Sequence, residues 1–265
     1  MEQARAYESL KYLEKETSKT NDALVVEAPL QININDTSYT VVMRTPGDDA
    51  DLVRGLLYAE DIYRGKPALV TAIFTTKSNY HSILNVSIPK EDIGKGYLNK
   101  RTLLSVSSCG ICGKKELQDI EASGTPIISS MQISIQAIEK MSAKMFGKQN
   151  LFKVSGGSHA CAIFDRQENL LTCKEDIGRH NAVDKCIGEL LNKNQLNSAK
   201  LMLVSGRVSY EIVSKAFFAK IPIIIAVSAC SSLAVDFAKE FGICLIGFHR
   251  NNRLTIYANP QYITL

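Results

Sequence analysis

Alternating apolar and polar positions predict a strand pair near the start of this 265-residue chain. Residues 31–35 show the two-residue period of a half-buried strand, and residues 39–43 are expected to return beside them after a polar turn. Residues 1–22, rich in Glu, Lys, Arg and Tyr, are interpreted as a charged leader that is flexible, helical or frayed. They lack the apolar centre of a secretory signal, so a cytoplasmic protein is expected.

Helical spacing follows this strand pair. Thr45 is expected to cap a helix that has Pro46 at its first position and ends before Gly65. A second helix is predicted over about 134–146, where apolar residues recur at helical spacing. The other elements expected in this half are strands at 69–75 and 82–88 and a short helix at 114–121.

From residue 150 onward, strand-like runs alternate with amphipathic helices. The apolar run Ile223–Val227 is typical of a strand buried on both faces, so we predict a mostly parallel sheet with helices on both faces. The expected strands are 160–164, 170–173, 200–204, 222–227, 243–248 and 253–257, and the expected helices are 180–192, 208–220 and 232–241. We expect an N-terminal β-rich region over 23–125 and an α/β ligand-binding region over 126–265.

Composition excludes several classes of partner. The net charge is +4, and no run of five Lys or Arg residues marks a nucleic-acid arm. No apolar stretch approaches the roughly 20 residues of a membrane-spanning helix. Neither nucleic acid nor a membrane is therefore an expected partner.

Three loops are expected to meet where the C-terminal strands end, since ligands of open α/β sheets bind outside the carboxyl ends of the strands. The loops begin at Ser205, Ser228 and Gly247. Two of them run into helices, whose first N–H groups favour an anion, and Arg207 and Arg253 can clamp a phosphate. The alternative is that the serines cap helices and the arginines are solvated. No Walker loop and no Gly-x-Gly-x-x-Gly motif occurs.

The segment 176–185 is dense in polar groups. His180 and Asp184 are one helical turn apart and share a face. His159, which follows two glycines, is expected to reach the same region. Both have plainer alternatives, a surface ion-pair cluster for the segment and a buried core histidine for His159.

Cys109 and Cys112 form the one closely spaced cysteine pair in the sequence. A structural zinc site needs four ligands, usually from two such pairs, so no metal is expected. Dithiol redox exchange is one use of such a pair. The other is a reactive thiolate that carries sulfur, favoured by the two lysines that follow and by two glycines that would make the loop mobile. The residues alone leave both uses open.

Several motifs in order resemble the FdhD family, accessory sulfurtransferases for formate dehydrogenase. The matching segments are 108–113, 155–160, 175–185, 205–211 and 226–229, and the likeness runs from about Val25 to Ile263. The resemblance implies a fold similar to cytidine deaminases, with a mixed sheet between helices, a smaller N-terminal β-rich subdomain, and a homodimer.

The resemblance also implies a sulfur relay. A cysteine desulfurase would load a persulfide onto Cys109, with Cys112 secondary. The sulfur would pass to the molybdenum cofactor in its bis(molybdopterin guanine dinucleotide) form, which serves formate dehydrogenase and which GDP would mimic. The family's cofactor-binding segment maps to Phe248, His249, Arg250, Asn251, Asn252 and Arg253. With the residues singled out above, the expected contacts also include Arg207, Ser228, His159 and His180.

Two rival functions follow from the same comparison. A deaminase needs His-x-Glu and Pro-Cys-x-x-Cys to hold zinc and move protons. Here Cys161 stands where the Glu would be and Ser108 precedes Cys109, so deamination is not expected. The other rival is a chaperone that binds the cofactor and moves no sulfur.

Overall fold

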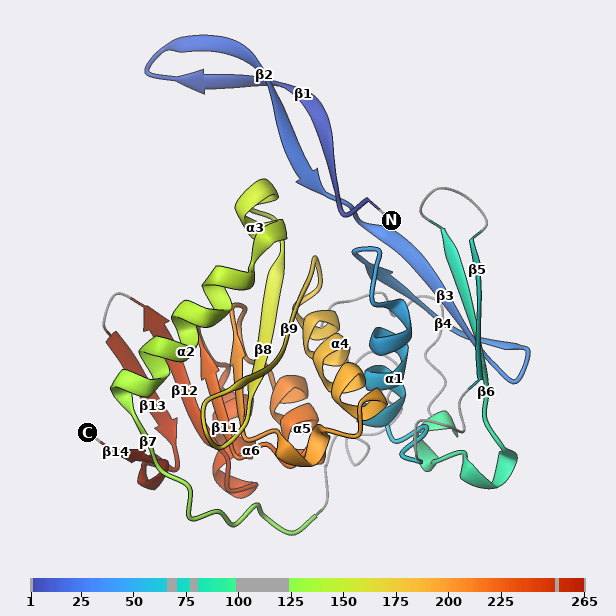
Figure 1. Ribbon diagram of the computed structural model, residues 1–265, viewed down its shortest axis with the longest axis vertical. Helices are drawn as coiled ribbons and strands as arrows, with labels where there is room; N and C mark the ends of the chain where they lie inside the picture. Colours follow the sequence, from blue (N-terminus) through green and yellow to red (C-terminus); the bar gives the residue numbers. More distant parts are fainter. Residues whose placement is uncertain (1, 66–70, 77–80, 99–123, 251–252, 265) are drawn as a thin grey trace.

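The computed structural model describes residues 2–65, 71–76, 81–98, 124–250 and 253–264. Figure 1 shows three parts within them: a mixed sheet between helices, a smaller sheet with one helix beside it, and a hairpin that projects beyond both. The cysteine pair and the helix expected at 114–121 lie outside the described residues.

The main sheet is mixed. Its strands in the described chain follow the order β13-β12-β11-β10-β8-β9, with β8 His159–Phe164, β9 Leu170–Asp176, β10 Leu201–Val204, β11 Ile223–Ala226, β12 Cys244–Arg250 and β13 Arg253–Ala258. Only β10, β11 and β12 pair in parallel, while the other three pairings are antiparallel. The mostly parallel sheet was a wrong prediction, whereas the mixed sheet implied by the family is confirmed. Short connections, such as that between β8 and β9, join antiparallel neighbours.

Helices cover both faces of this sheet (Figure 1). On one face lie α4 Arg179–Asn192, α5 Tyr210–Phe218 and α6 Ser232–Glu240, and on the other lies α2 Ile135–Lys148, followed by α3 Asn150–Ser155. The apolar stripe of α2, namely Ala137, Ile138, Met141 and Met145, is buried as the spacing predicts. No helix in the described ranges is long and apolar enough to cross a membrane.

The smaller sheet has the order β4-β3-β6-β5 in the described residues. Its strands are β3 Ala28–Ile34, β4 Thr37–Arg44, β5 Thr71–Thr76 and β6 Ser82–Ser87, and α1 Asp49–Ala59 packs on it. Alternate residues of β3, Leu30, Ile32 and Ile34, are fully buried. Asn35 and Asp36 form the turn to β4 with positive φ angles of 49° and 62°, as a tight hairpin turn requires.

The start of α1 differs from the prediction. The helix begins at Asp49, after Asp48 in a left-handed conformation. Thr45 caps nothing. It is buried, its N–H donates to the Asp176 carboxylate at 3.1 Å, and its Oγ1 accepts from the N–H of Ile177 at the same distance. A contact with a segment 131 residues away therefore overrides a sound local capping signal.

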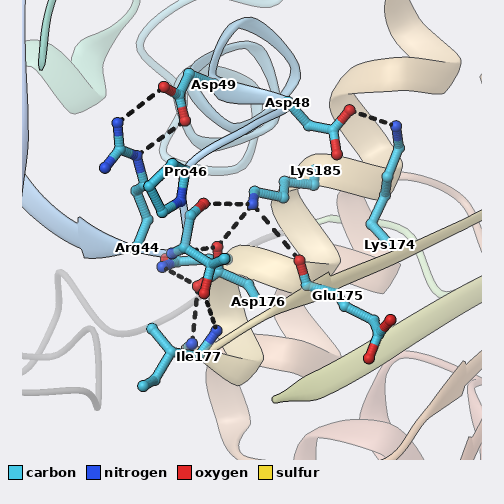
Figure 2. A network of polar contacts seen from close by, with 12 residues as sticks. Arg44, Pro46, Asp48, Asp49, Lys174, Glu175, Asp176, Ile177 and Lys185 are labelled. Atoms are coloured by element: carbon cyan, nitrogen blue, oxygen red, sulfur yellow. Dashed lines mark hydrogen bonds and ion pairs between the residues drawn. The ribbon is translucent and has the colours of Figure 1, made fainter. Parts of the chain in front are cut away.

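Backbone packing and buried charge join α1, on the smaller sheet, to α4, on the main sheet. A methyl group on Gly55 of α1 would overlap the carbonyl oxygen of Asp184 in α4, and one on Gly188 would overlap that of Asp51, so the helices touch backbone to backbone. Figure 2 shows the charged part of this junction. There, fully buried Lys185 pairs with Asp176 at 2.8 Å and donates to the carbonyl of Thr45 at 2.9 Å.

A second buried ion pair connects the end of β4 to the start of α1. Arg44 reaches both carboxylate oxygens of Asp49, at 2.9 and 3.0 Å (Figure 2). It also donates to the carbonyl of Ala28 at 3.2 Å and to Ser82 Oγ at 3.1 Å. Because its donors are satisfied, the fully buried guanidinium is held without a loss of hydrogen bonds.

The hairpin corrects the interpretation of the first residues as a helical or frayed leader. Strands β1 Ala4–Leu13 and β2 Glu16–Val25 pair along their whole length. The turn residues Glu14 and Lys15 both have positive φ angles, 50° and 70°. Such turns usually carry Asn and Gly, so the sequence holds no hairpin signal at this point. The division into regions at residues 22 and 125 stays a prediction.

Candidate functional site

Two of the three predicted loops lie side by side at the carboxyl ends of β10 and β11. The N–H of Val208 donates to the carbonyl of Ala229, and the N–H of Ser231 donates to that of Val208, both at 3.0 Å. These bonds hold the loops together just before α5 and α6 begin. The two helix N-termini therefore face the same edge of the sheet, where their potential favours an anion.

The third segment is a strand rather than a loop, since β12 continues to Arg250 and pairs there with Arg253 of β13. It still contacts the loop that follows β11, because the N–H of Phe248 donates to the carbonyl of Ser228 at 3.0 Å. Phe248 has a positive φ of 53° and is 39% exposed. A bulky side chain rarely adopts this conformation, which redirects the strand at the site.

The side chains of the predicted segment 248–253 do not all face the same surface. Phe248, Arg250 and Arg253 are exposed, whereas His249 is 7% exposed. Burial lowers the pKa of His249, opposed by the charge of Glu139 on α2, so this ring faces the α2 side of the sheet. Its Nδ1 has no hydrogen-bond partner among the described residues. Asn251 and Asn252 lie outside them.

His159 reaches the edge because β8 runs antiparallel to β10, so that β8 begins where β10 ends. Ser205 fixes this register, since its Oγ accepts from the N–H of Ala160 at 2.9 Å. A methyl group on Gly206 would lie 3.1 Å from Cβ of Arg179 and 3.2 Å from Nδ1 of His159. Gly206 thus lies directly between these two side chains.

Positive charge dominates around His159. Burial and then the charge of Arg179 lower its pKa, Arg207 adds to this effect, and Asp176 opposes it. The ring is consequently neutral at neutral pH. An anion that bound here would meet two guanidinium groups and would favour a proton on His159.

His180, at the start of α4, points to α5. Its Nε2 lies 3.1 Å from Ser209 Oγ, and its Nδ1 lies 3.1 Å from Glu211 Oε2. Asp184, on the same face of α4, pairs with Lys215 at 2.7 Å, and both are buried. The dense segment 176–185 is therefore not a surface ion-pair cluster: its charges are divided between the α1–α4 junction and this contact with α5.

Several residues that line this edge were not among the predicted contacts. They are Ser205, which begins one of the predicted loops, and Ser209, Glu211 and Arg179. Arg179 could have been found from its neighbour His180, which was named. Ser209 and Glu211 lie in the segment 205–211 that resembles the family, and this is the signal that could have found them. Their residue types alone carry none, because a Ser before a helix and a Glu in its first turn are ordinary capping residues.

The described cysteines suit packing rather than chemistry. Cys161, Cys186 and Cys244 are buried. Burial raises the pKa of Cys244 and of the half-buried Cys173 and Cys230 to about 12, which keeps these thiols protonated. In the part of the chain that the structure describes, no three His, Cys, Asp or Glu side chains are grouped to hold a metal. Whether the chain binds zinc stays a prediction, because Cys109 and Cys112 lie outside that part.

Comparison with known proteins identifies the family. The FdhD/NarQ family model matches residues 25–264. The chain belongs to the FdhD/NarQ family. Within it, the "Sulfur carrier protein FdhD" of Sulfolobus acidocaldarius is 38% identical over 249 residues, 94% of each chain. The protein of the same name from Saccharolobus solfataricus is 36% identical over 263 residues, 98% of each chain.

A solved structure shows the same fold. The crystal structure of a protein described as a formate dehydrogenase accessory protein, from Desulfotalea psychrophila, superposes on this FdhD/NarQ chain with a TM-score of 0.76. The match covers 99% of this chain and all of the other, at 21% sequence identity. The similarity to cytidine deaminases stays a prediction.

Proposed function

We propose that this FdhD/NarQ chain is a sulfur carrier and sulfurtransferase in the maturation of formate dehydrogenase. The observation that carries the proposal is the family match over nearly the whole chain, with relatives named as sulfur carriers at 36–38% identity. In this proposal Cys109 accepts a persulfide from a cysteine desulfurase, and Cys112 assists. The chain works as a homodimer with formate dehydrogenase as the final client.

The acceptor in this proposal is the molybdenum cofactor in its bis(molybdopterin guanine dinucleotide) form, bound as a substrate at the strand-end edge. The edge suits the phosphates of that molecule because it combines two helix N-termini with Arg179 and Arg207. Exposed Phe248 offers a face on which a guanine can stack. His159, His180, Ser228, Arg250 and Arg253 are the further contacts we propose.

Two other functions are alternatives. A chaperone would bind the cofactor there and move no sulfur, and a dithiol redox protein would use the cysteine pair without the edge. A direct test incubates the full chain with a desulfurase and cysteine and measures the intact mass. We expect one added sulfur, absent in Cys109→Ser and retained in the matched variant Cys112→Ser.

Cofactor binding at the edge is tested separately by calorimetry with GDP. Binding that weakens in Arg253→Ala and in Arg207→Ala supports the edge as the site. GDP binding without any added sulfur would favour the chaperone. An added sulfur that persists in Cys109→Ser would remove that residue from the persulfide role, and an added sulfur without GDP binding would remove the edge.

A further inference from the structure

Two serines occupy equivalent positions at the candidate edge and make different contacts. Ser209 and Ser231 are each the residue before a helix that follows a parallel strand. Ser231 caps its helix in the ordinary way, since its Oγ accepts from the N–H of Ala234 at 3.2 Å. The hydroxyl of Ser209 makes no such capping bond and lies 3.1 Å from Nε2 of His180.

The other side of His180 faces a carboxylate. Nδ1 lies 3.1 Å from Glu211 Oε2, which is an ion-pair distance, and this oxygen makes no hydrogen bond within the described residues. In the tautomer that carries its proton on Nδ1, Nε2 accepts a hydrogen bond from the Ser209 hydroxyl. That arrangement activates a serine nucleophile.

Buried charge behind Glu211 holds it in place. Its second oxygen lies 3.6 Å from Nζ of Lys215, which pairs with Asp184 at 2.7 Å. The His180 and Glu211 side chains are only 12% and 16% exposed, so solvent screens their attraction weakly. Within the described residues, the charged groups near His180 are Arg179 and Asp184 on its own helix and Glu211 and Lys215 on α5. More distantly lies Glu60, whose charge acts on Asp184 and Lys215.

The surroundings of Ser209 suit a developing negative charge. Helix α5 begins at Tyr210, directly after the serine, so the positive end of the helix dipole lies beside the hydroxyl. Arg207 stands two residues earlier in the same loop, and Arg179 adjoins His180. Both arginines act on the neighbouring His159, which favours an anionic substrate, and the helix end would stabilise an oxyanion formed next to Ser209.

We propose that Ser209 is a nucleophile activated by His180, with Glu211 as the positioning residue, and that it takes an ester or thioester bearing a phosphate. In the first step the Ser209 hydroxyl gives its proton to Nε2 while Oγ bonds to the acyl carbon. The bond to the leaving group breaks, and the leaving group departs with that proton. Water then cleaves the acyl-serine by the reverse sequence and restores the hydroxyl. This activity uses neither cysteine and stands apart from sulfur transfer.

A fluorophosphonate probe tests the proposal on the full chain. We expect one covalent adduct on Ser209, formed with loss of fluoride and located by peptide mass spectrometry. Ser209→Ala should abolish it and Ser231→Ala, the matched control, should keep it. His180→Gln should slow labelling at least about 100-fold, in line with loss of a general base. Sulfate, as a competing anion, should slow labelling of the wild-type chain.

The role of Glu211 needs a readout that a merely structural residue would not change. The labelling rate should rise with pH as His180 loses its proton, and Glu211→Gln should move the midpoint of that rise to lower pH, because the carboxylate no longer stabilises the charged ring. Unlabelled wild-type protein, or an adduct on another residue, overturns the proposal. So does labelling at an unchanged rate in a folded His180→Gln variant.

Discussion

Helix α4 contributes to two regions that use charge in opposite ways. Its middle lies against α1, where Lys185 is matched to Asp176 and the cation is fully buried. Its first turn lies at the strand-end edge, beside His159. Burial is the largest cause of the lowered pKa of His159, and the charges of Arg179 and Arg207 lower it further. In the first region the charges compensate each other and serve stability. In the second, two arginines act on a neutral ring, which suits an incoming anion.

The largest expected effect comes from breaking the compensated pair. Lys185→Met leaves the Asp176 carboxylate buried without its cation, so we expect the free energy of unfolding to fall by about 3–5 kcal/mol. At the C-terminal end of the same helix, Lys193 is 53% exposed and makes an ion pair with Glu189. Lys193→Met should therefore cost only about 0.3–0.5 kcal/mol. Urea unfolding of both variants measures the difference, and equal losses would show that burial of the pair does not matter.

Backbone contact between α1 and α4 gives the next largest effect. Gly55→Ala puts a methyl group onto the Asp184 carbonyl, so the helices must separate. We expect a loss of about 1–3 kcal/mol in thermal or urea unfolding. Gly147 of α2 has nothing within 4 Å of an added methyl group. Gly147→Ala should consequently leave stability unchanged or raise it by up to about 1 kcal/mol, and a harmless Gly55→Ala would refute the close contact.

The smallest effect concerns the strand-end edge. Arg207→Ala should raise the pKa of His159 toward its ordinary value, because a neighbouring positive charge is lost. Arg253 makes no contribution to that shift, so Arg253→Ala is the control. Histidine ring NMR titrations measure both. A His159 pKa that stays in place in Arg207→Ala would separate this arginine from the site.

The lowered pKa of His159 also predicts how pH affects the stability of the fold and the binding of an anion. Because the unfolded chain binds the proton more readily, the stability from the neutral ring is present above the unfolded pKa near 6.5 and is lost as pH falls toward the folded pKa. An anion bound at the edge favours the charged ring. Sulfate, which does not titrate in this range, should therefore bind more tightly as pH falls below about 6.5. Calorimetry across that range checks the direction.

The sequence predicts those parts of the fold that local chemistry decides. The stripe of α2 and the apolar run of β11 need only their own periodicity, and both are as expected. The sequence does not reveal that β8 returns antiparallel, and this reversal is what places His159 beside Gly206 and Arg179. The position of His159 at the edge therefore depends on topology that no short pattern encodes.

Long-range contacts explain the other differences. Thr45 has a sound capping pattern, yet Asp176 and Ile177 use its polar groups. Glu14 and Lys15 have no turn pattern, yet full pairing of β1 with β2 holds them in a left-handed conformation. The contact of His180 with Ser209 joins residues 29 apart in the chain, so no local pattern reveals it.

The glycine contact between α1 and α4 has a consequence for synthesis of the chain. Gly188 is added to the chain about 130 residues after Gly55, which takes on the order of 10 s at the usual rate of 5–20 residues per second. Until then the surface of α1 that meets α4 has no partner. The N-terminal unit therefore emerges from the ribosome with that surface uncovered, and a chaperone would have to shield it until α4 is complete.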